Sequence, residues 1–597
     1  MLPDPMLPDP IPDTPTAGHA DLTWSEDGAP RSARFGDVYF SKDDGLAESR
    51  AVFLQGCGLP DGWAGRDMYT VAELGFGTGL NIIALLDLWR REGPDKGRLN
   101  VFSIEAFPLT AEEAARALAA WPEVADIAAA LIAAWPAGTP GFHRIDLPAF
   151  RATIDLAVGD AAWALEAWLG QADAWFLDGF SPALNPGMWS EAVMDGIAAR
   201  SAPGARVATF TVAGAVRRGL SERGFQVHKR PGHGRKRERL EARLPEAAPT
   251  VATPPSVAVI GAGIAGASVV RALKALGVPV VLIEAERPGA GGSGFPAALV
   301  TPRLDAGDAV IAGFHAQALE RARALYGATP GAVIAGGVIQ LEQADRDAVR
   351  FAKVAAQPVW AEGEMTAVEG GLRMAGALTV APRRILQSWL DGVTVVTGRV
   401  DRIEPAGTRL IGTGLILSDE AGAVLAEAQA VVVTTGWGAA VLAPALGLKP
   451  VRGQANWVET DAVPTALAWG GYIAPTGTGF LFGATHDRDD TGTEVRPADT
   501  DRNRAVLAAR LPELAERVEA MPVEARAAIR ATTADRLPVC GALGEGLYVL
   551  GGLGSRGFCV APLLAEHLAA VIANAPSPLP AGFAARLSPD RFEAGRR

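Results

Sequence analysis

The sequence predicts an α/β protein with two nucleotide-binding domains in tandem. A glycine-rich strand–loop–helix pattern occurs in each half of the chain, at residues 69–91 and 257–276, and a charged, then Pro/Ala-rich stretch separates the two. The length of 597 residues agrees with more than one domain. Hydrophobic residues make up 49% of the chain and charged residues 20%, which excludes a wholly disordered protein.

The composition also limits the partners and the compartment. The 55 Lys and Arg residues against 67 Asp and Glu residues give a net charge of −12, which excludes a uniformly basic coat but allows a local basic patch. Cys57, Cys540 and Cys559 are too few for a disulfide scaffold and lack CxxC spacing. This favours a cytoplasmic location and no metal site. Apolar runs stay below the ~20 residues of a membrane span, so we expect a soluble protein without membrane contact.

The domain boundaries follow from shifts in composition. Residues 1–20 are acidic and proline-rich and lack the basic and apolar regions of a signal peptide, so we expect a disordered extension there. The segment LPEAAPTVATPPS follows a charged run, and the apolar run VAVI begins at residue 257. We therefore expect one domain at 21–243, a linker at 244–256 and a second domain at 257–597.

The first domain carries the first glycine loop. A strand at 69–74 precedes GFGTG at 75–79, and an amphipathic helix follows from 80 to 91. Glycines let the backbone approach a ligand closely, and the first turn of a helix offers N–H groups to an anion or a carboxylate. By itself a GxGxG pattern is a weak signal, because a structural turn explains it equally well.

Acidic residues follow at the ends of three further strand-like segments. Glu105 ends a strand at 101–104, Asp160 follows the next strand-like piece, and Asp178 follows the run AWFL. In an open parallel sheet such ends border the ligand crevice, and the acid after the second strand can accept hydrogen bonds from ribose hydroxyls. Each acid alone is better explained as a solvated loop carboxylate. Their order, however, favours a nucleotide-binding sheet.

These segments resemble the Rossmann-like class I S-adenosylmethionine methyltransferases. More narrowly, they resemble the methyltransferase half of the bifunctional tRNA 5-methylaminomethyl-2-thiouridine biosynthesis (MnmC) family. The matching motifs are FGDVYFS, ELGFGTGLN, IEAFPLT and DGFSPALNPGMW. The first and last of these are more specific than the glycine loop.

The resemblance implies a role for six residues of the first domain. Glu105 would hold the cofactor ribose, Asp160 would lie near the adenine, and Asp178 would sit beside the amine that is methylated. The methionine part of S-adenosylmethionine would be surrounded by Gly75, Gly77 and Gly79. The chemistry suits Asp178, because only a free amine attacks a methyl sulfonium, and a carboxylate can orient that nitrogen and accept its proton.

The second domain opens with GAGIAG at 261–266, directly after the strand at 257–260. A helix and a second strand follow, and Glu284 comes 23 residues after Gly261, close to the ~20 residues expected for a ribose-binding acid. The pattern is typical of a dinucleotide-binding fold. The alternative is a βαβ unit with an empty loop.

Downstream segments favour FAD over NAD. A second loop of small residues lies at 289–298. The run VVVTTGWG at 431–438 is typical of a strand that ends in a glycine turn. At 547–557 a strand and a glycine loop precede an apolar helix. The N-terminal dipole of that helix can stabilise negative charge on a reduced flavin. The cofactor-binding candidates of this domain are Gly261, Gly263, Gly266, Glu284, Ser293, Gly436, Gly554 and Arg556.

This half resembles the glycine/D-amino-acid oxidase superfamily of FAD enzymes, and most narrowly the oxidoreductase half of the same bifunctional family. The motifs are GAGIAG, GGSGFPAALVTPR, GGYIAP, LFGATHDRDD, IRATTADRLPVCG and GLGSRGFCVAPLLAE. The resemblance implies an inserted mixed-sheet substrate subdomain. It also places Arg530 at the arginine that clamps a substrate carboxylate, a task that suits a planar guanidinium. A structural ion pair is the alternative for Arg530, and GGSGF departs from the expected GASGN at Phe295.

A basic run offers the one compositional argument for RNA. Between residues 229 and 243, seven basic residues accompany only Glu238 and Glu241. Phosphate contacts from such a patch would supply salt-sensitive RNA affinity, although a solvated helix face is the simpler explanation. The basic residues are Lys229, Arg230, Arg235, Lys236, Arg237, Arg239 and Arg243.

Taken together, the resemblance implies a bifunctional enzyme acting on the wobble uridine of tRNA. The FAD domain would convert 5-carboxymethylaminomethyl-(2-thio)uridine to 5-aminomethyl-(2-thio)uridine, releasing glyoxylate, and the methyltransferase domain would then methylate the amine. Two alternatives stay open: a glycine- or sarcosine-type oxidase fused to a small-molecule amine methyltransferase, and, less favoured, a non-catalytic RNA-binding scaffold. The sequence leaves the oligomeric state open and allows a monomer.

Overall fold

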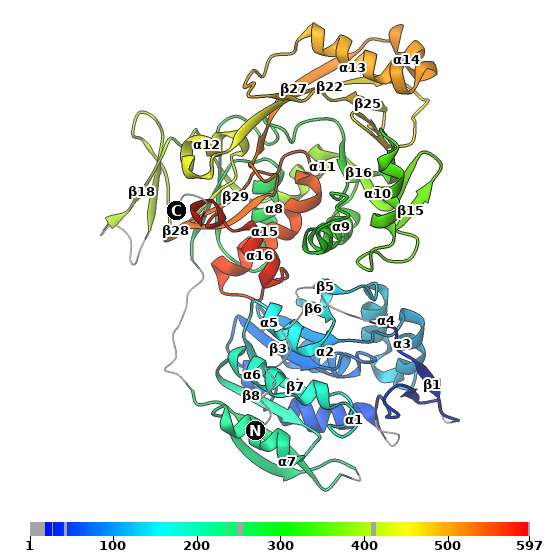
Figure 1. Cartoon of the computed structure of the whole chain (residues 1–597). Helices are drawn as coiled ribbons and strands as arrows, with labels where there is room; N and C mark the ends of the chain where they lie inside the picture. The colour runs from blue at the N-terminus through cyan, green and yellow to red at the C-terminus, as the bar shows by residue number, and fades with distance from the viewer. Residues whose placement is uncertain are drawn as a thin grey trace, which may run out of the picture. The chain divides into compact units, whose positions relative to one another are not determined.

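The chain divides into two compact units, Met1–Val251 and Ala252–Arg597, each with its own α/β sheet (Figure 1). The expected extension at 1–20 lies, apart from residues 18–20, outside the described residues, as does most of the expected linker at 244–256. The computed structural model describes residues 18–26, 28–40, 44–234, 236–246, 255–407 and 414–594.

The first unit contains an eight-stranded sheet in the order β5-β6-β4-β3-β7-β8-β10-β9. Strands β6, β4, β3, β7 and β8 run parallel, whereas β5 and β10 run antiparallel to their neighbours. The strands are β3 (Met68–Leu74), β4 (Arg98–Glu105), β5 (Gly141–Leu147), β6 (Ala152–Val158), β7 (Ala172–Leu177), β8 (Ser201–Thr209), β9 (Gln226–Pro231) and β10 (Glu238–Arg243).

Helices cover both faces of this sheet. Side chains of β3 alternate between two hydrophobic clusters: Val71 packs with α2 and α4 on one face, and Leu74 with α5, α6 and α7 on the other. Because both faces are covered, the middle strands are mostly apolar in sequence. The helices are α1 (Gly45–Ser49), α2 (Leu80–Glu92), α3 (Ala111–Leu118), α4 (Ala125–Ala133), α5 (Ala161–Ala167), α6 (Glu191–Ala199) and α7 (Gly214–Glu222).

The second unit contains a six-stranded sheet in the order β17-β12-β11-β21-β29-β28, parallel except for β28. Helices α8 (Ile264–Ala275), α9 (Ala309–Gly327) and α15 (Gly557–Ala573) share its hydrophobic core. The strands are β11 (Val257–Ile260), β12 (Val280–Glu284), β17 (Thr394–Thr397), β21 (Ala430–Val433), β28 (Val539–Gly544) and β29 (Leu547–Gly551).

A ten-stranded mixed sheet forms the rest of the second unit's framework, as the expected substrate subdomain requires. Helices α13 (Pro497–Arg510) and α14 (Pro512–Glu519) lie over β22, β25 and β27 at one end of this sheet (Figure 1). Its strands are β13 (Ala298–Val300), β14 (Val333–Leu341), β15 (Met365–Val368), β16 (Gly371–Val380), β22 (Lys449–Glu459), β23 (Leu467–Ala468), β24 (Tyr472–Pro475), β25 (Gly479–Gly483), β26 (Asp487–Arg488) and β27 (Glu524–Thr532).

Smaller elements complete both units. In the described part of the chain, no helix combines the length and the apolar composition that a bilayer crossing requires. The remaining strands and helices are β1 (Leu22–Trp24), β2 (Pro30–Ser32), β18 (Arg402–Pro405), β19 (Leu415–Ser418), β20 (Val424–Ala428), α10 (Arg346–Ala355), α11 (Pro382–Trp389), α12 (Ala439–Leu442), α16 (Ala581–Leu587) and α17 (Arg591–Ala594).

Candidate active sites

The first glycine loop connects β3 to α2. Gly75, Gly77 and Gly79 have φ values of 82°, 53° and 78°, in the left-handed region that favours glycine. A Cβ atom on Gly75 would lie 3.0 Å from the Cα atom of Gly179, so the loop packs directly against the turn after β7. Within the described part of the chain, no side chain caps the first turn of α2. The loop therefore fits an S-adenosylmethionine carboxylate at this helix end.

Glu105 ends β4 beside this loop. Its two carboxylate oxygens accept hydrogen bonds from the backbone N–H groups of Gly77 and Phe107, each at 2.9 Å. Burial raises the pKa of Glu105, and these backbone donors oppose the shift. The carboxylate thus joins the end of β4 to the glycine loop, in the position where a ribose-binding acid is expected.

Asp160 has a clear local role at the start of α5. Its Oδ1 atom accepts hydrogen bonds from the N–H groups of Ala162 at 2.9 Å and Trp163 at 3.4 Å. Such an N-cap contributes about 1 kcal/mol to helix stability. The cap explains this acid without a ligand, and its contact with adenine stays a prediction.

Asp178, directly after β7, belongs to a chain of buried hydrogen bonds. The Asn81 Nδ2 atom donates to Asp178 Oδ2 at 2.7 Å and to Glu73 Oε1 at 3.0 Å. Ser49 Oγ donates to Asn81 Oδ1 at 2.6 Å, which sets the orientation of the amide. Burial raises the pKa of Asp178 to about 6, while the Asn81 hydrogen bond favours its charged form.

Sequence reasoning missed Glu73 and Asn81. Glu73 is 0% exposed, and Ser103 Oγ donates to its carboxyl group at 2.6 Å. Burial raises the pKa of Glu73 well above its ordinary value. One signal was available: Glu73 is the only carboxyl group in a mostly apolar strand whose two faces are both covered.

Two distant motifs of the family resemblance meet at this site. The Phe180 ring of DGFSP lies 4.8 Å from the Phe35 ring and 5.3 Å from the Tyr39 ring, measured between centroids. The Ser181 N–H donates to Asp37 Oδ2 at 3.2 Å. Burial and then Glu105 raise the pKa of Tyr39. Residues 35–39 therefore pack against the loop that carries Asp178.

The basic run forms strands, so its interpretation as a helix face is wrong. Residues 226–231 and 238–243 pair as the antiparallel β9–β10 hairpin, and Arg235 lies outside the described residues. Lys236, in the connection, pairs with Glu48 at 2.7 Å, and its charge lowers the pKa of Asp178. Other ion pairs within the segment are Lys229–Glu238, Arg230–Glu241, Arg239–Glu241 and Arg243–Glu246.

The second glycine loop connects β11 to α8. Gly261 has a φ of 101°, and a Cβ atom there would lie 2.9 Å from the Thr434 carbonyl oxygen. A Cβ atom on Gly266 would lie 1.8 Å from the Gly261 carbonyl oxygen, and one on Gly263 would lie 3.2 Å from Ser293 Oγ. Only glycine permits this close approach of helix and loop, as dinucleotide-binding folds require.

Glu284 and Ser293 border this loop. Glu284 Oε2 accepts a hydrogen bond from the Ala262 N–H at 2.7 Å, and Ser293 Oγ accepts one from the Ile264 N–H at 2.9 Å. Phe295, where the sequence departs from the family pattern, lines a cavity of about 510 Å³ together with Ser293. Glu284 therefore accepts a backbone hydrogen bond from the second glycine loop, as Glu105 does from the first.

The remaining candidates of this domain lie after β21 (Gly436) and just before α15 (Gly554 and Arg556). Gly436 and Gly554 have φ values of 58° and 56°. Arg556 Nη1 donates to the Thr301 hydroxyl at 2.8 Å, and burial lowers the arginine's pKa. Nearby, burial followed by the charges of Arg556 and Arg303 holds the pKa of His315 well below its ordinary value.

The polar groups of this region fit a bound FAD. The buried atoms His315 Nδ1 and Thr435 Oγ1 have no hydrogen-bond partner among the described residues. Thr435 follows β21, next to the glycine loop of β11. Buried polar atoms are normally paired, so a ligand that offers hydrogen bonds here suits the site.

Arg530 lies on β27. Its Nη1 atom donates to the Thr485 carbonyl oxygen at 3.3 Å, and burial lowers its pKa. Within the described chain, no carboxylate forms an ion pair with it, so the structural ion pair considered from the sequence is not found there. The guanidinium is left with donors for a substrate carboxylate.

Comparison with known families agrees with both sites. Residues 122–245 match the family described as S-adenosyl-L-methionine-dependent methyltransferase, and residues 256–571 match FAD dependent oxidoreductase. The protein is therefore a bifunctional enzyme that uses S-adenosylmethionine and FAD, which confirms the predicted fold class and cofactors. Among the described residues, no group of His, Cys, Asp and Glu side chains could hold a metal ion.

The particular family is shown by full-length relatives. The chain is 54% identical to the tRNA 5-methylaminomethyl-2-thiouridine biosynthesis bifunctional protein MnmC of Caulobacter sp. (strain K31), over 97% of this chain and 98% of that protein. It is 43% identical to the protein of the same name from Maricaulis maris (strain MCS10), over 97% of each chain. The chain belongs to the MnmC family, which confirms the resemblance stated from the sequence.

Proposed function

We propose that this enzyme modifies the wobble uridine of tRNA in two consecutive steps. The FAD unit converts 5-carboxymethylaminomethyl-(2-thio)uridine to the 5-aminomethyl form, and the methyltransferase unit converts that to 5-methylaminomethyl-(2-thio)uridine. The observation that carries the proposal is the 54% identity to a relative named for this biosynthesis, spanning 98% of that relative. We assign residues 21–243 to the methyltransferase domain and 257–597 to the FAD domain.

In the first step, Arg530 holds the carboxylate of the carboxymethylamino group. Among the described residues its guanidinium has one hydrogen bond, to the Thr485 carbonyl, and a planar guanidinium can give two parallel bonds to a carboxylate. FAD, when bound, accepts two electrons from the C–N bond next to that carboxylate. Water then adds to the oxidised carbon, and the bond breaks to leave glyoxylate and a primary amine on the tRNA.

In the second step, Asp178 orients the primary amine and accepts its proton. S-adenosylmethionine, when bound, supplies the methyl group. A carboxylate whose pKa is about 6 is a stronger base than an ordinary aspartate and is still mostly ionised at neutral pH. Asn81 holds Oδ2 of Asp178, which leaves Oδ1 to contact the substrate nitrogen.

The charges of the two sites support this order of steps. The initial substrate carries a carboxylate and fits Arg530, a half-buried cation that forms no ion pair among the described residues. The intermediate has lost that carboxylate and carries a basic amine, which fits Asp178. Reversing the order would present a secondary amine with a carboxylate to the acidic site.

The β9–β10 hairpin is the surface that we assign to tRNA phosphates. Its residues 226–246 hold seven basic side chains and three acidic ones, in a chain whose overall charge is negative. Lys236 places one end of the hairpin within electrostatic reach of Asp178. Such a surface attracts phosphates without reading sequence. We infer a cytoplasmic location from the tRNA substrate and from three buried free cysteines.

Nucleoside analysis of tRNA tests the proposal. tRNA that carries the carboxymethylaminomethyl group is incubated with the purified enzyme, first without and then with S-adenosylmethionine. We expect the aminomethyl nucleoside in the first case and the methylaminomethyl nucleoside in the second. Unchanged tRNA, together with oxidation of free glycine or N-methylglycine, would instead support a small-molecule oxidase.

A further inference from the structure

Arg530 lies directly over a glycine of the neighbouring strand. Strands β22 and β27 pair antiparallel, with Val451 opposite Arg530. Gly453, two residues further on, presents the same face, because side chains alternate along a strand. A Cβ atom on Gly453 would lie 2.2 Å from Nη1 and 2.5 Å from Cζ of Arg530. Only glycine at this position leaves room for the guanidinium where it lies.

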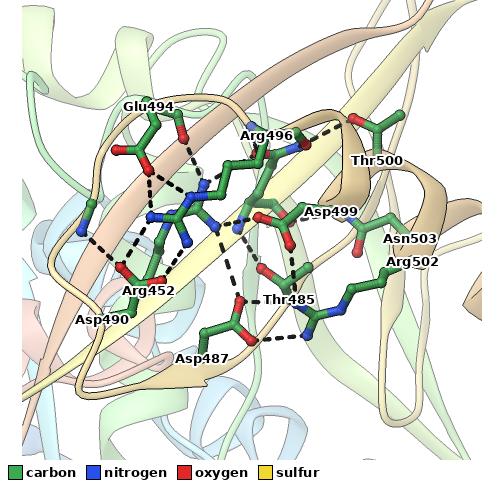
Figure 2. A network of polar contacts seen from close by, with 12 residues as sticks. Arg452, Thr485, Asp487, Asp490, Glu494, Arg496, Asp499, Thr500, Arg502 and Asn503 are labelled. Carbon is green, nitrogen blue, oxygen red and sulfur yellow. Dashed lines mark hydrogen bonds and ion pairs between the residues drawn. The ribbon is translucent and has the colours of Figure 1, made fainter.

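The opposite face of β22 is polar and fully buried. Arg452, Gln454 and Asn456 are each 0% exposed, and each contacts helix α13. Arg452 Nη1 forms an ion pair with Asp499 of α13 (Figure 2). Asn503 of the same helix donates to the Asn456 side chain at 2.8 Å and to the Gln454 carbonyl at 2.9 Å. A polar cluster of this kind fixes one arrangement of strand and helix.

This cluster also holds the loop that contacts Arg530. The Thr485 N–H donates to the Gln454 carbonyl and the Gln454 N–H donates to Thr485 Oγ1, both at 3.0 Å. The Gln454 side chain bonds both backbone groups of Arg496, at 2.8 and 2.9 Å. Gln454 therefore fixes both Thr485 and Arg496. The carbonyl of Thr485 in turn accepts the hydrogen bond from Arg530.

Charged side chains close the loop around Arg452. Arg452 Nη2 donates to the Glu494 carbonyl at 2.6 Å. Asp487 pairs with Arg502 of α13 at 2.9 Å, and Arg496 pairs with Asp490 (Figure 2). These two pairs are partly exposed, whereas the Arg452–Asp499 pair is buried. Removing one partner of a buried pair leaves an uncompensated charge and is strongly destabilising. The loop is thus held to the strand and to the helix at several points.

We propose that Gly453 and the network of Arg452, Gln454 and Asp499 position the Arg530 guanidinium for the substrate carboxylate. Gly453 supplies the space on one side, and the network fixes the Thr485 carbonyl that orients the guanidinium. The role of Arg530 itself rests on the proposed function. Gly453 and the network touch no substrate and act only through Arg530.

A double-mutant cycle tests the role of Gly453. In the full-length FAD-loaded enzyme, Gly453→Ala should lower kcat/KM for oxidation of carboxymethylaminomethyl-tRNA roughly tenfold or more, as loss of a charge-assisted bond does. In an Arg530→Ala background, the same change should have no further effect, since its target is gone. An equal loss in both backgrounds would show that Gly453 acts only on packing and would overturn the proposal.

Gly336→Ala is the matched control, because a Cβ atom on this substrate-sheet glycine would have nothing within 4 Å. It should oxidise tRNA at the wild-type rate. Flavin content and methylation of supplied aminomethyl-tRNA should stay normal in every variant. If wild-type enzyme oxidises the tRNA but Gly453→Ala does so equally well, the positioning role is wrong. If wild-type enzyme does not oxidise it, the proposed function fails and this inference with it.

Asp499→Asn tests the network from the other face of β22. It keeps the side-chain shape but removes the charge that pairs with Arg452. We expect lower kcat/KM for oxidation with unchanged methylation, and rescue by Asp499→Glu. Wild-type oxidation by a correctly folded Asp499→Asn enzyme would show that the network does not position Arg530.

Discussion

The Asn81 side chain donates hydrogen bonds to two carboxyl groups, Asp178 at 2.7 Å and Glu73 at 3.0 Å. Its own carbonyl accepts from Ser49 at 2.6 Å, so the amide cannot turn over without losing three bonds. A single neutral side chain thereby sets both the direction and the basicity of the proposed catalytic carboxylate.

Asp178→Ala should abolish methyl transfer and leave oxidation intact, because it removes the proposed base from a unit that contains no part of the FAD site. tRNA should accumulate with the aminomethyl nucleoside, measured by nucleoside analysis. Flavin absorbance serves as the control for folding of the second unit. Methylated product formed at the wild-type rate would show that another group accepts the proton.

The acidic limb of the pH–rate profile for methyl transfer should reflect Asp178. Its pKa is raised to about 6, so the base becomes protonated and the rate falls as the pH drops through that value. Asn81→Ala removes a bond to the charged form, which raises the pKa further and moves the limb to higher pH. Ser103→Ala is the matched control, because it removes a bond to Glu73 and none to Asp178. Identical profiles for all three proteins would contradict this role of Asn81.

Glu73→Gln should flatten the pH dependence of stability in the first unit. Burial raises the pKa of Glu73 well above its ordinary value, so the folded state keeps this proton to a higher pH than the unfolded chain, in which a Glu has a pKa of about 4.3. Since the folded state binds more protons, stability falls as the pH rises above that value. Denaturant unfolding between about pH 5 and pH 8 measures the slope. Equal slopes for variant and wild type would mean that Glu73 is ionised when folded.

Arg530→Ala should weaken oxidation of carboxymethylaminomethyl-tRNA and spare methylation of supplied aminomethyl-tRNA. Loss of a charge-assisted hydrogen bond costs about 1.5–3 kcal/mol, or roughly ten- to a hundred-fold in kcat/KM. Steady-state kinetics on both tRNA forms measure the difference. Unchanged oxidation would move the clamp to another arginine, such as Arg303 or Arg556.

Removing an acid from the β9–β10 hairpin should strengthen tRNA binding. Glu238→Gln frees Lys229 from an ion pair of 2.7 Å, so one more cation can contact phosphate and the salt slope of binding should steepen by up to about 1. Lys229→Gln should change affinity and slope in the opposite direction. Filter binding over a salt series measures both. Superimposable lines would show that tRNA docks elsewhere.

The parts of each site that depend on local sequence could be predicted. A strand, a glycine loop and an acid at the next strand end lie close together in the chain, so Glu105 and Glu284 were found beside their loops. The basic run was misjudged, because β9 lacks the alternation that marks a half-buried strand and only residues 239–243 of β10 show it. Pairing of β10 with β8 and β9 makes the run a hairpin.

Contacts between distant segments could not be predicted. Gly453 lies beneath Arg530 only because β22 and β27 pair in one register, and a single sequence does not contain that register. Likewise, Asn81 meets Asp178 across 97 residues. Asn81 lies in the first turn of α2, and the sequence around it is equally typical of a helix whose residues serve only packing.

Because Arg530 and Asp178 belong to different units, failure of either site would leave a different electrical charge at the wobble base. Without Arg530, the nucleoside would keep its secondary ammonium and its carboxylate, which cancel. Without Asp178, it would carry a bare primary ammonium and a net positive charge. Ion-exchange retention of the nucleoside would therefore tell the two defects apart. A codon would pair with a neutral wobble base after loss of Arg530 and with a cationic one after loss of Asp178.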